Sequence, residues 1–367
     1  DSEQLIQLPW KPEVGWLPSD IYLDGKIVEH GPRTVLKNIL ADAKSKGYRV
    51  KSGVECEYFI LNSEGTAVSD PADLQPKPCY DQQALMRRYD MVAEICDHMQ
   101  TLGWGPYQND HEDANGQFEM NWDYSDALTT ADRHSFFKYM VKTVAENHGF
   151  RATFMPKPLP TLTGNGCHAH ISVWNNDGRS NLMEDSSGEL GLSELAYHFI
   201  GGLLKHATSI TAVTNPVVNS YKRINAPQTT SGATWSPNTV TYSGNNRTHM
   251  IRIPDNDRIE VRLADGAANP YLLQAALIGT GLWGIENKTS PGKRLDIDMY
   301  AEGHKIRNAP KLPLNLMDAL RNFDRNKILR GVLGEAFSDS YYKLKMDEWN
   351  QYMQHFSEWE RLNALDV

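Results

Sequence analysis

Four short segments of the chain alternate ionisable or amide side chains with apolar ones. Successive side chains of a strand point to opposite faces, so each segment would collect its polar residues on one face. The polar sets are Glu55 with Glu57, Gln117 with Glu119, His168 with His170 and Ser172, and Arg258 with Glu260 and Arg262. The pattern predicts strands whose other face is apolar and therefore has to be buried.

Helical and strand-like patterns alternate along the rest of the chain. Residues 1–31 predict two or three short strands joined by turns, and residues 50–61 are rich in β-branched and aromatic residues. Apolar spacing predicts helices over residues 34–46, 82–102, 130–148, 193–212, 270–283, 314–322 and 339–362. The sequence therefore predicts an α+β fold with long loops between its strands.

The polar faces have two interpretations. Each could be the solvated side of a half-exposed strand, which is the ordinary pattern of antiparallel sheets. If the faces converge instead, they bring together five glutamates and one histidine: Glu55, Glu57, Glu112, Glu119, Glu260 and His168. This oxygen-rich set suits Mg²⁺ or Mn²⁺ and not zinc, and so many carboxylates stay ionised together only with cations between them.

Arginines in loops and strand ends flank these segments: Arg223, Arg247, Arg252, Arg258 and Arg262. A guanidinium can bind a phosphoryl group through two hydrogen bonds, so several of them beside a metal-type site indicate phosphoryl transfer. A phosphate-binding GxxxxGK[ST] loop is absent from the sequence. The residues therefore predict a multi-metal enzyme that uses ATP.

One motif points elsewhere. Residues 279–284 read GTGLWG and match the dinucleotide-binding pattern GxGxxG. That motif must follow a strand, whereas Pro270 and the helix formers after it predict that these glycines lie inside a helix. Close packing between helices is the favoured interpretation.

Composition excludes further classes. A formal charge of −9 leaves no basic surface for nucleic acid, and no apolar run reaches the length of a membrane span. The four cysteines, Cys56, Cys79, Cys96 and Cys167, include no CxxC pair, so free thiols in a reducing cytoplasm are expected. Because the chain starts at Asp1, we also expect N-terminal residues that precede this sequence.

The motifs resemble those of the glutamine synthetase family over nearly the whole chain. They are GVECEYF (53–59), HEDANGQFE (111–119), ATFMPKP (152–158), GNGCHAH (164–170), NPVVNSYKR (215–223), NNRTHMIRIP (245–254) and RIEVRLADGAANPYL (258–272). HEDANGQFE and SGATWSP (231–237) look most like the branch of rhizobial-type class III synthetases and γ-glutamylmethylamide synthetases. Residues 1–31 resemble the end of the family's β-grasp domain, and residues 32–367 its catalytic domain, in which helices surround a curved antiparallel sheet that lines the active site.

The resemblance implies ATP-dependent ligation of glutamate with ammonia through γ-glutamyl phosphate. Two or three Mg²⁺ or Mn²⁺ ions would bind, with Glu57, Glu112 and Glu119 around the first and Glu55, His168 and Glu260 around the second. The implied substrate-binding residues are Gly164, Arg223 and Arg262 for glutamate and His170, Ser172, Arg252 and Arg258 for the nucleotide. Arg247 would neutralise the charge that develops on the phosphoryl group.

Two departures from the family pattern bear on the amine. Residues 224–246 contain no Asp or Glu, although this loop usually supplies a glutamate that accepts a proton from ammonium. A larger amine such as methylamine is therefore an alternative, with Trp235 as a wall or cation–π contact. Thr163 stands where many relatives have asparagine.

The resemblance also implies assembly. The family forms homo-oligomers with sites between subunits, which predicts a dodecamer of two hexameric rings. A catalytically weak relative that acts as a binding or assembly protein is a further alternative, although the complete set of predicted ligands argues against it.

Overall fold

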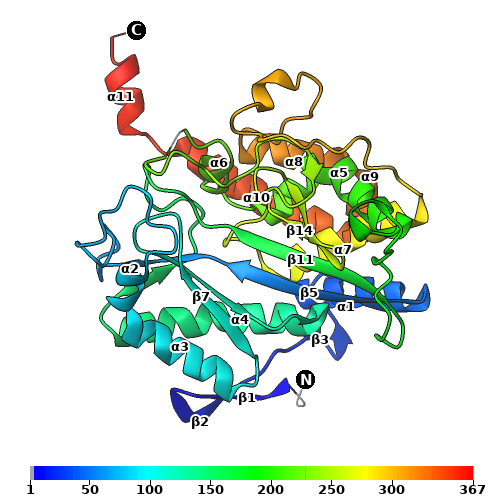
Figure 1. The fold of residues 1–367 in the computed structure, drawn as a ribbon, viewed down its shortest axis with the longest axis horizontal. Helices are drawn as coiled ribbons and strands as arrows, with labels where there is room; N and C mark the ends of the chain where they lie inside the picture. Colours follow the sequence, from blue (N-terminus) through cyan, green and yellow to red (C-terminus); the bar gives the residue numbers. More distant parts are fainter. Residues whose placement is uncertain (1–3, 228, 367) are drawn as a thin grey trace.

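The computed structural model describes residues 4–227 and 229–366. Residues 1–3, 228 and 367, which fall within the predicted domain ranges 1–31 and 32–367, lie outside the described residues. Two sheets carry the polar segments, and helices surround them (Figure 1). The predicted α+β class is confirmed.

The larger sheet has six strands in the order β12-β13-β14-β11-β5-β9. Their bounds are β5 (Tyr48–Cys56), β9 (Ser125–Asp126), β11 (Cys167–Asn175), β12 (Tyr242–Ser243), β13 (Ile251–Asp255) and β14 (Arg258–Val261). Neighbouring strands are antiparallel except β12 and β13, which are parallel. The sheet is therefore antiparallel, as predicted, up to its β12 edge.

A second, antiparallel sheet has the order β10-β6-β8-β7. It consists of β6 (Tyr58–Leu61), β7 (Pro106–His111), β8 (Gln117–Trp122) and β10 (Arg151–Thr153). Glu57 alone separates β5 from β6, and its backbone N–H donates to the Gly166 carbonyl at 3.2 Å. One continuous segment thus joins the two sheets at a predicted site residue.

The apolar face of the large sheet is buried under helices. Val54, Cys56, Cys167, Ala169 and Ile171 are each at most 5% exposed, and α1 (Pro32–Ser45) and α4 (Ala127–Asn147) contact β5 from this side. Burial of this face fixes the register of the strands, because a slip by one residue would turn it to the other side.

A helical layer lies beyond, built on α5 (Glu194–Thr214) and α7 (Pro270–Glu286). A Cβ atom on Gly284 would lie 2.3 Å from the His198 carbonyl, and one on Gly281 would meet the Phe199 ring at 2.2 Å. The GxGxxG motif therefore lies inside a helix and permits close helix packing, which confirms its interpretation.

The remaining helices differ in part from the predicted ranges. They are α2 (Gln82–Met86), α3 (Tyr89–Thr101), α6 (Ser220–Ile224), α8 (Leu316–Arg325), α9 (Lys327–Leu333), α10 (Glu335–Gln354) and α11 (Glu358–Ala364), with short 3₁₀ turns η2 (Glu189–Gly191) and η3 (Gly303–Lys305). The helix predicted over 82–102 is broken at Arg88, whose Nε donates to Ser69 Oγ at 2.9 Å. The one predicted over 339–362 is broken where Ser357 and Glu360 form a capping box that starts a new helix.

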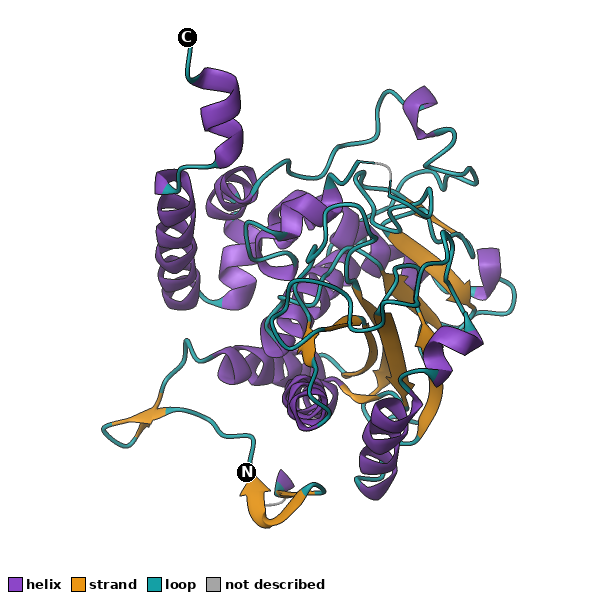
Figure 2. Ribbon diagram, turned by 90° about the vertical axis from the view of Figure 1, so that its left-hand side faces the viewer, coloured by secondary structure: helices purple, strands orange, loops and turns teal. Residues whose placement is uncertain are grey.

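Both ends of the chain lie at the periphery. The N-terminal hairpins, β1 (Ile6–Leu8) with β2 (Lys11–Trp16) and β3 (Tyr22–Leu23) with β4 (Lys26–Ile27), lie at the opposite side of the molecule from α11, which projects outward (Figures 1 and 2). Trp10 and Trp16 pack on Phe136 of α4, with ring centroids 5.6 and 5.3 Å apart.

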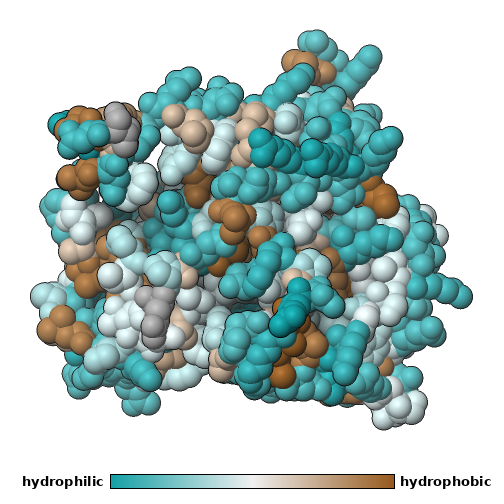
Figure 3. Space-filling view, turned by 90° about the horizontal axis from the view of Figure 1, so that it is seen from above, coloured by the Kyte–Doolittle hydropathy of each residue, from teal (hydrophilic) through white to brown (hydrophobic). Residues whose placement is uncertain are grey.

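Hydrophilic side chains predominate on the face seen in Figure 3, with apolar ones scattered among them. Within the described ranges, no helix is both long and apolar enough to cross a bilayer.

Candidate active site

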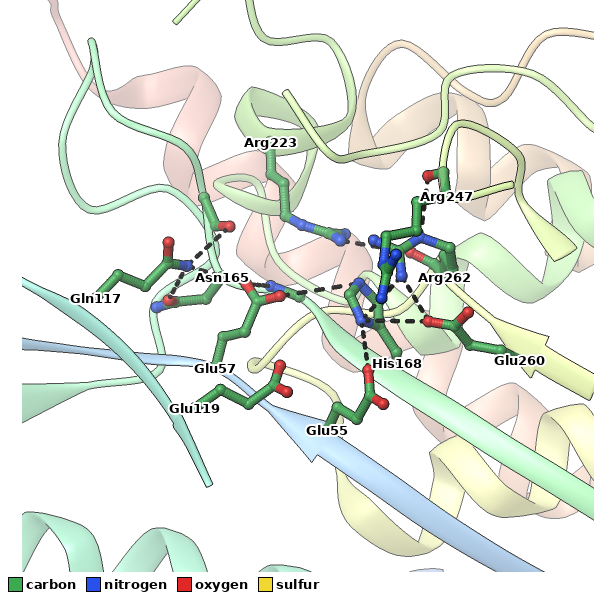
Figure 4. Close-up of polar contacts among 12 residues, drawn as sticks. Glu55, Glu57, Gln117, Glu119, Asn165, His168, Arg223, Arg247, Glu260 and Arg262 are labelled. Atoms are coloured by element: carbon green, nitrogen blue, oxygen red, sulfur yellow. Dashed lines mark hydrogen bonds and ion pairs between the residues drawn. The ribbon is translucent and has the colours of Figure 1, made fainter. Parts of the chain in front are cut away.

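The polar faces converge through residues paired directly across neighbouring strands. His168 of β11 is opposite Glu55 of β5, His170 is opposite Glu260 of β14, and Glu260 is in turn opposite Arg252 of β13. Figure 4 shows the side chains of Glu55, Glu57, Glu119, Glu260 and His168 directed toward a common centre. These faces therefore form one site, and the interpretation as separate solvated strand faces is wrong.

A pocket of about 490 Å³, here called the carboxylate pocket, occupies this centre. Ten of the residues predicted from the sequence line it: Glu55, Glu57, Glu112, Glu119, His168, His170, Arg247, Arg252, Arg258 and Arg262. Glu260 is fully buried beside it, 3.6 Å from His168 Nδ1.

The ligand atoms of this pocket form three overlapping groups that could each hold an ion. The groups are Glu55 with Glu119 and His168, Glu55 with His170 and Glu260, and Asp110 with Glu112 and Glu119, each with ligand atoms within 4.8 Å of one another. Glu57 instead accepts hydrogen bonds at Oε2 from Gln117 Nε2 at 2.9 Å and from the Gly166 N–H at 2.6 Å. These groups differ from the two ligand sets that the family resemblance implies. The first group, for example, combines Glu119 of one implied set with Glu55 and His168 of the other.

One ring nitrogen of His168 could bind a metal ion. Its Nδ1 lies 3.1 Å from Glu55 Oε2, so we assign the proton to Nδ1, which donates to that carboxylate. Nε2 then carries a lone pair, is buried and has no hydrogen-bond partner among the described residues. An unprotonated ring nitrogen among carboxylates fits a divalent cation.

Two of the carboxylates are electrostatically crowded. Burial, followed by repulsion from Glu57 and Asp110, raises the pKa of Glu112 well above its usual value. Burial and repulsion from Glu55 and Glu112 do the same to the pKa of Glu119. A bound cation would relieve this repulsion, because it favours the ionised form of each group.

Histidine and arginine favour the ionised form of two further carboxylates, Glu55 and Glu260. Burial opposes the charge of Glu55, but hydrogen bonds from His168 and then His170 lower its pKa well below the usual value. Burial likewise opposes the charge of Glu260, and the charge of Arg262 lowers its pKa. Arg252 Nη1 donates to Glu260 Oε2 at 2.9 Å.

The three residues implied for glutamate do not all open onto the carboxylate pocket. Arg262 lines it, whereas Arg223 is 2% exposed and donates from Nη1 to the Leu263 carbonyl at 3.0 Å. Burial lowers the pKa of Arg223. Gly164 lies against Arg223, and a Cβ there would come within 2.2 Å of the Pro156 carbonyl, so no larger residue fits.

Three of the four residues implied for the nucleotide, His170, Ser172 and Arg258, line a second pocket of about 160 Å³, whereas Arg252 lines only the carboxylate pocket. Glu55, Tyr107, His170 and Arg258 line both pockets. Ser172 lies only in the second, where its Oγ accepts a hydrogen bond from Trp174 Nε1 at 2.8 Å. The two pockets therefore meet at the wall formed by His170 and Arg258, where Arg258 Nε donates to His170 Nδ1 at 3.2 Å.

The structure adds residues that the sequence analysis missed. Asp110 faces Glu119 directly across β7 and β8 and lines the carboxylate pocket. Asp110 lies two residues before Glu112, and this is the same spacing that identified the polar pairs on the other strands. Asp113, which is 8% exposed, accepts hydrogen bonds from Thr163 and from Ser231. The second bond connects the loop of residues 224–246, which lacks Asp and Glu, to the segment that carries Glu112. No local pattern predicts those contacts, because the three residues are far apart in sequence.

Comparisons with known proteins match the whole chain. A family described as "Glutamine synthetase, catalytic domain" matches residues 29–364. A Rhizobium leguminosarum bv. phaseoli protein named glutamine synthetase is 61% identical over 367 residues, which cover 100% of this chain and 84% of that protein. The glutamate–methylamine ligase of Methyloversatilis universalis is 40% identical over 378 residues, with 100% of this chain and 84% of that protein covered. A solved structure described as "GmaS/ADP complex-Conformation 1" has a TM-score of 0.96 at 62% identity and covers 100% of this chain and 84% of that one.

Proposed function

The chain belongs to the glutamine synthetase family, and we propose that it is an ATP-dependent ligase that joins the γ-carboxylate of glutamate to a small amine. The family uses ATP and divalent metals and acts on glutamate and ammonia or an amine. The observation that carries the proposal is the carboxylate pocket, where a metal-type ligand set and four arginines line one cavity.

The proposed reaction has two steps. A γ-carboxylate oxygen of glutamate attacks the terminal phosphorus of ATP, so that ADP leaves and γ-glutamyl phosphate forms. The amine nitrogen then attacks the acyl carbon, the C–O bond to phosphate breaks, and the amine loses one proton. The products are ADP, phosphate and a γ-glutamyl amide.

Arginines surround the position of the transferred group in this proposal. Arg247 is exposed and lines the carboxylate pocket. The backbone carbonyl of Arg247 accepts a hydrogen bond from Arg262 Nε at 3.1 Å. In this proposal Arg247 would neutralise phosphoryl charge, and Arg252 and Arg258 would contact the nucleotide. Arg262 and Gly164 would contact glutamate, with the buried Arg223 lying behind Gly164. Two or three divalent cations held by Glu57, Glu112 and Glu119 and by Glu55, His168 and Glu260 would supply the positive charge that orients both substrates.

We favour a methylamine-sized amine over ammonia. Trp235 lines the carboxylate pocket and adopts φ 47°, a left-handed conformation that a tryptophan rarely takes. Its ring lies edge-on to Tyr300 at 6.1 Å, which gives the amine side of the pocket an apolar wall. Asp110, which the sequence analysis missed, also lines this pocket, and its carboxylate could accept a proton from either amine, so it does not distinguish between them. Ammonia is the second candidate, since the Rhizobium relative at 61% identity is named glutamine synthetase.

We also propose the ring assembly that the resemblance implies, a dodecamer of two hexameric rings, with residues 1–31 as the end of a β-grasp domain and residues 32–367 as the catalytic domain. Large apolar side chains are exposed at both peripheral ends, including Leu23 at 68%, Trp359 at 70% and Leu362 at 77%. Burial between subunits would remove them from water. Light scattering of the purified protein tests the subunit number.

A coupled assay of phosphate release tests the activity. The reaction contains ATP, Mg²⁺ and glutamate, with ammonia, methylamine or ethylamine as the amine, and is compared with a reaction without amine. We expect amine-stimulated release, with kcat/KM higher for methylamine than for ammonia. A higher value for ammonia would reverse the order of the two candidates, and no stimulation by any amine would refute the ligase proposal.

A further inference from the structure

The face of the large sheet opposite the carboxylate pocket carries a second, chemically different cluster. Cys56 lies between the site residues Glu55 and Glu57, and Cys167 directly precedes His168. Because side chains alternate along a strand, both thiols point away from the pocket and into the core. Both cysteines are 0% exposed, and their Cα atoms are direct partners across β5 and β11.

His134 of α4 completes the cluster. Its Nε2 lies 3.3 Å from Cys56 Sγ and 3.9 Å from Cys167 Sγ, and all three ligand atoms lie within 4.8 Å of one another. Its Nδ1 has no hydrogen-bond partner in the described parts of the chain, so no other group dictates which ring nitrogen carries the proton. Nε2 can therefore present its lone pair to the two sulfurs.

The two sulfur–nitrogen separations, 3.3 and 3.9 Å, lie on either side of the value expected around a metal ion. With metal–sulfur bonds of about 2.3 Å and metal–nitrogen bonds of about 2.0 Å in tetrahedral geometry, sulfur and nitrogen ligands lie about 3.5 Å apart. Two thiolates and one imidazole are soft or borderline ligands, which select Zn²⁺ or Cu⁺ over the hard cations that suit the carboxylate pocket. The same two strands thus separate two classes of metal ligand by face.

We propose that Cys56, Cys167 and His134 form a buried site for one thiophilic d¹⁰ cation, Zn²⁺ or Cu⁺, distinct from the carboxylate pocket. The ion replaces the thiol protons when it binds, because thiolate is the ligand form of cysteine. Since the site is closed, the ion enters as the chain folds. This proposal does not depend on the amine that the ligase uses.

Cadmium serves as the probe, because its thiolate complexes absorb in the ultraviolet whereas its carboxylate complexes do not. The full chain is produced in cells grown with Cd²⁺, so that the ion is present during folding, and is then dialysed against EDTA under reducing conditions. We expect about one retained Cd²⁺ per chain together with the thiolate absorption. Cys56→Ala and Cys167→Ala should each reduce the retained Cd²⁺ and the thiolate absorption at least tenfold. The matched control carries Cys79→Ala and Cys96→Ala, which alter the two half-buried cysteines, and should keep both signals.

A second measurement uses only the unaltered protein, in case the core variants do not fold. X-ray absorption of chain produced with Zn²⁺ should show two sulfur neighbours at about 2.3 Å and one nitrogen at about 2.0 Å. The absorption edge of chain from unsupplemented cells then distinguishes zinc from copper. Folded wild-type chain without a sulfur-bound ion in both preparations would overturn the proposal and leave S–H···N hydrogen bonding as the whole role of the cluster.

Discussion

Arg252 and Glu260 are direct partners across β13 and β14, and Arg252 Nη1 donates to Glu260 Oε2 at 2.9 Å. The other carboxylate oxygen of Glu260 accepts from Arg262. Glu260 is thus an anion shared by two arginines at a position with 0% exposure. Each buried charge thus has a partner before any cation or substrate binds, and removal of one member would leave the others uncompensated.

Removal of this carboxylate should destabilise the fold. We expect Glu260→Ala to lower the free energy of unfolding by about 3–5 kcal/mol, since two buried guanidinium groups lose their partner. Urea unfolding of the metal-free protein measures the change. Asp257→Ala is the matched control, because Asp257 pairs with Arg258 at a half-exposed position and should cost at most about 1 kcal/mol. Equal losses in the two variants would contradict the role of Glu260.

Arg247→Ala should reduce turnover far more than ATP affinity. A group that acts on charge developing in the transition state changes kcat, and the loss of one such donor costs about 10²- to 10³-fold. Steady-state kinetics and nucleotide titration separate the two quantities. Arg321→Ala, at a position 60% exposed on α8, should leave both unchanged. The assignment fails if Arg247→Ala weakens kcat and ATP binding to the same extent.

Trp235→Ala should reduce the preference for methylamine over ammonia. One methyl group in an apolar pocket contributes about 1–3 kcal/mol to discrimination, so the ratio of the two kcat/KM values should fall at least about tenfold. Trp235→Phe keeps an aromatic wall and should preserve most of the preference. If both variants keep the wild-type ratio, another residue selects the amine.

Stability should fall between neutral and mildly acidic pH partly through His206, which is 4% exposed. Burial, and then the charge of Lys205, lowers the pKa of His206 from 6.5 to about 4. Between these two values the unfolded chain binds a proton that the folded chain does not, so the free energy of unfolding decreases as the pH falls from 6.5 toward 4. The shift in the pKa of His206 therefore contributes about 3 kcal/mol to the free energy of unfolding. This amount is present in full above pH 6.5 and is lost as the pH falls to about 4.

Urea unfolding at pH 7 and pH 5 measures the effect. His206→Gln should lose less stability than the wild type over this interval. His304→Gln, which changes an exposed histidine, should follow the wild type. An identical pH response in all three proteins would show that His206 does not titrate as described.

The alternation of polar and apolar residues predicted most of the carboxylate pocket, because period two holds within one strand whatever the rest of the fold does. Contacts between residues on different strands could not be predicted, because they depend on which strands pair and in which register. Cys56 and Cys167 are 111 positions apart and meet only through the register of β5 and β11. The contact of Ser231 with Asp113 likewise depends on how a long loop folds back. The apolar spacing that predicted one helix over 339–362 takes no account of the capping box formed by Ser357 and Glu360, where a new helix starts.

The single residue between β5 and β6 restricts how this part of the chain can diverge. Each strand is paired to different partners, so the register of β5 is fixed by β11 and that of β6 by β8 and β10. Substitutions here change one side chain at a time, but an insertion or deletion would reverse the facing of an entire strand. The length of this segment is therefore constrained by the two sheets, independently of the ligand roles proposed for the side chains that it carries.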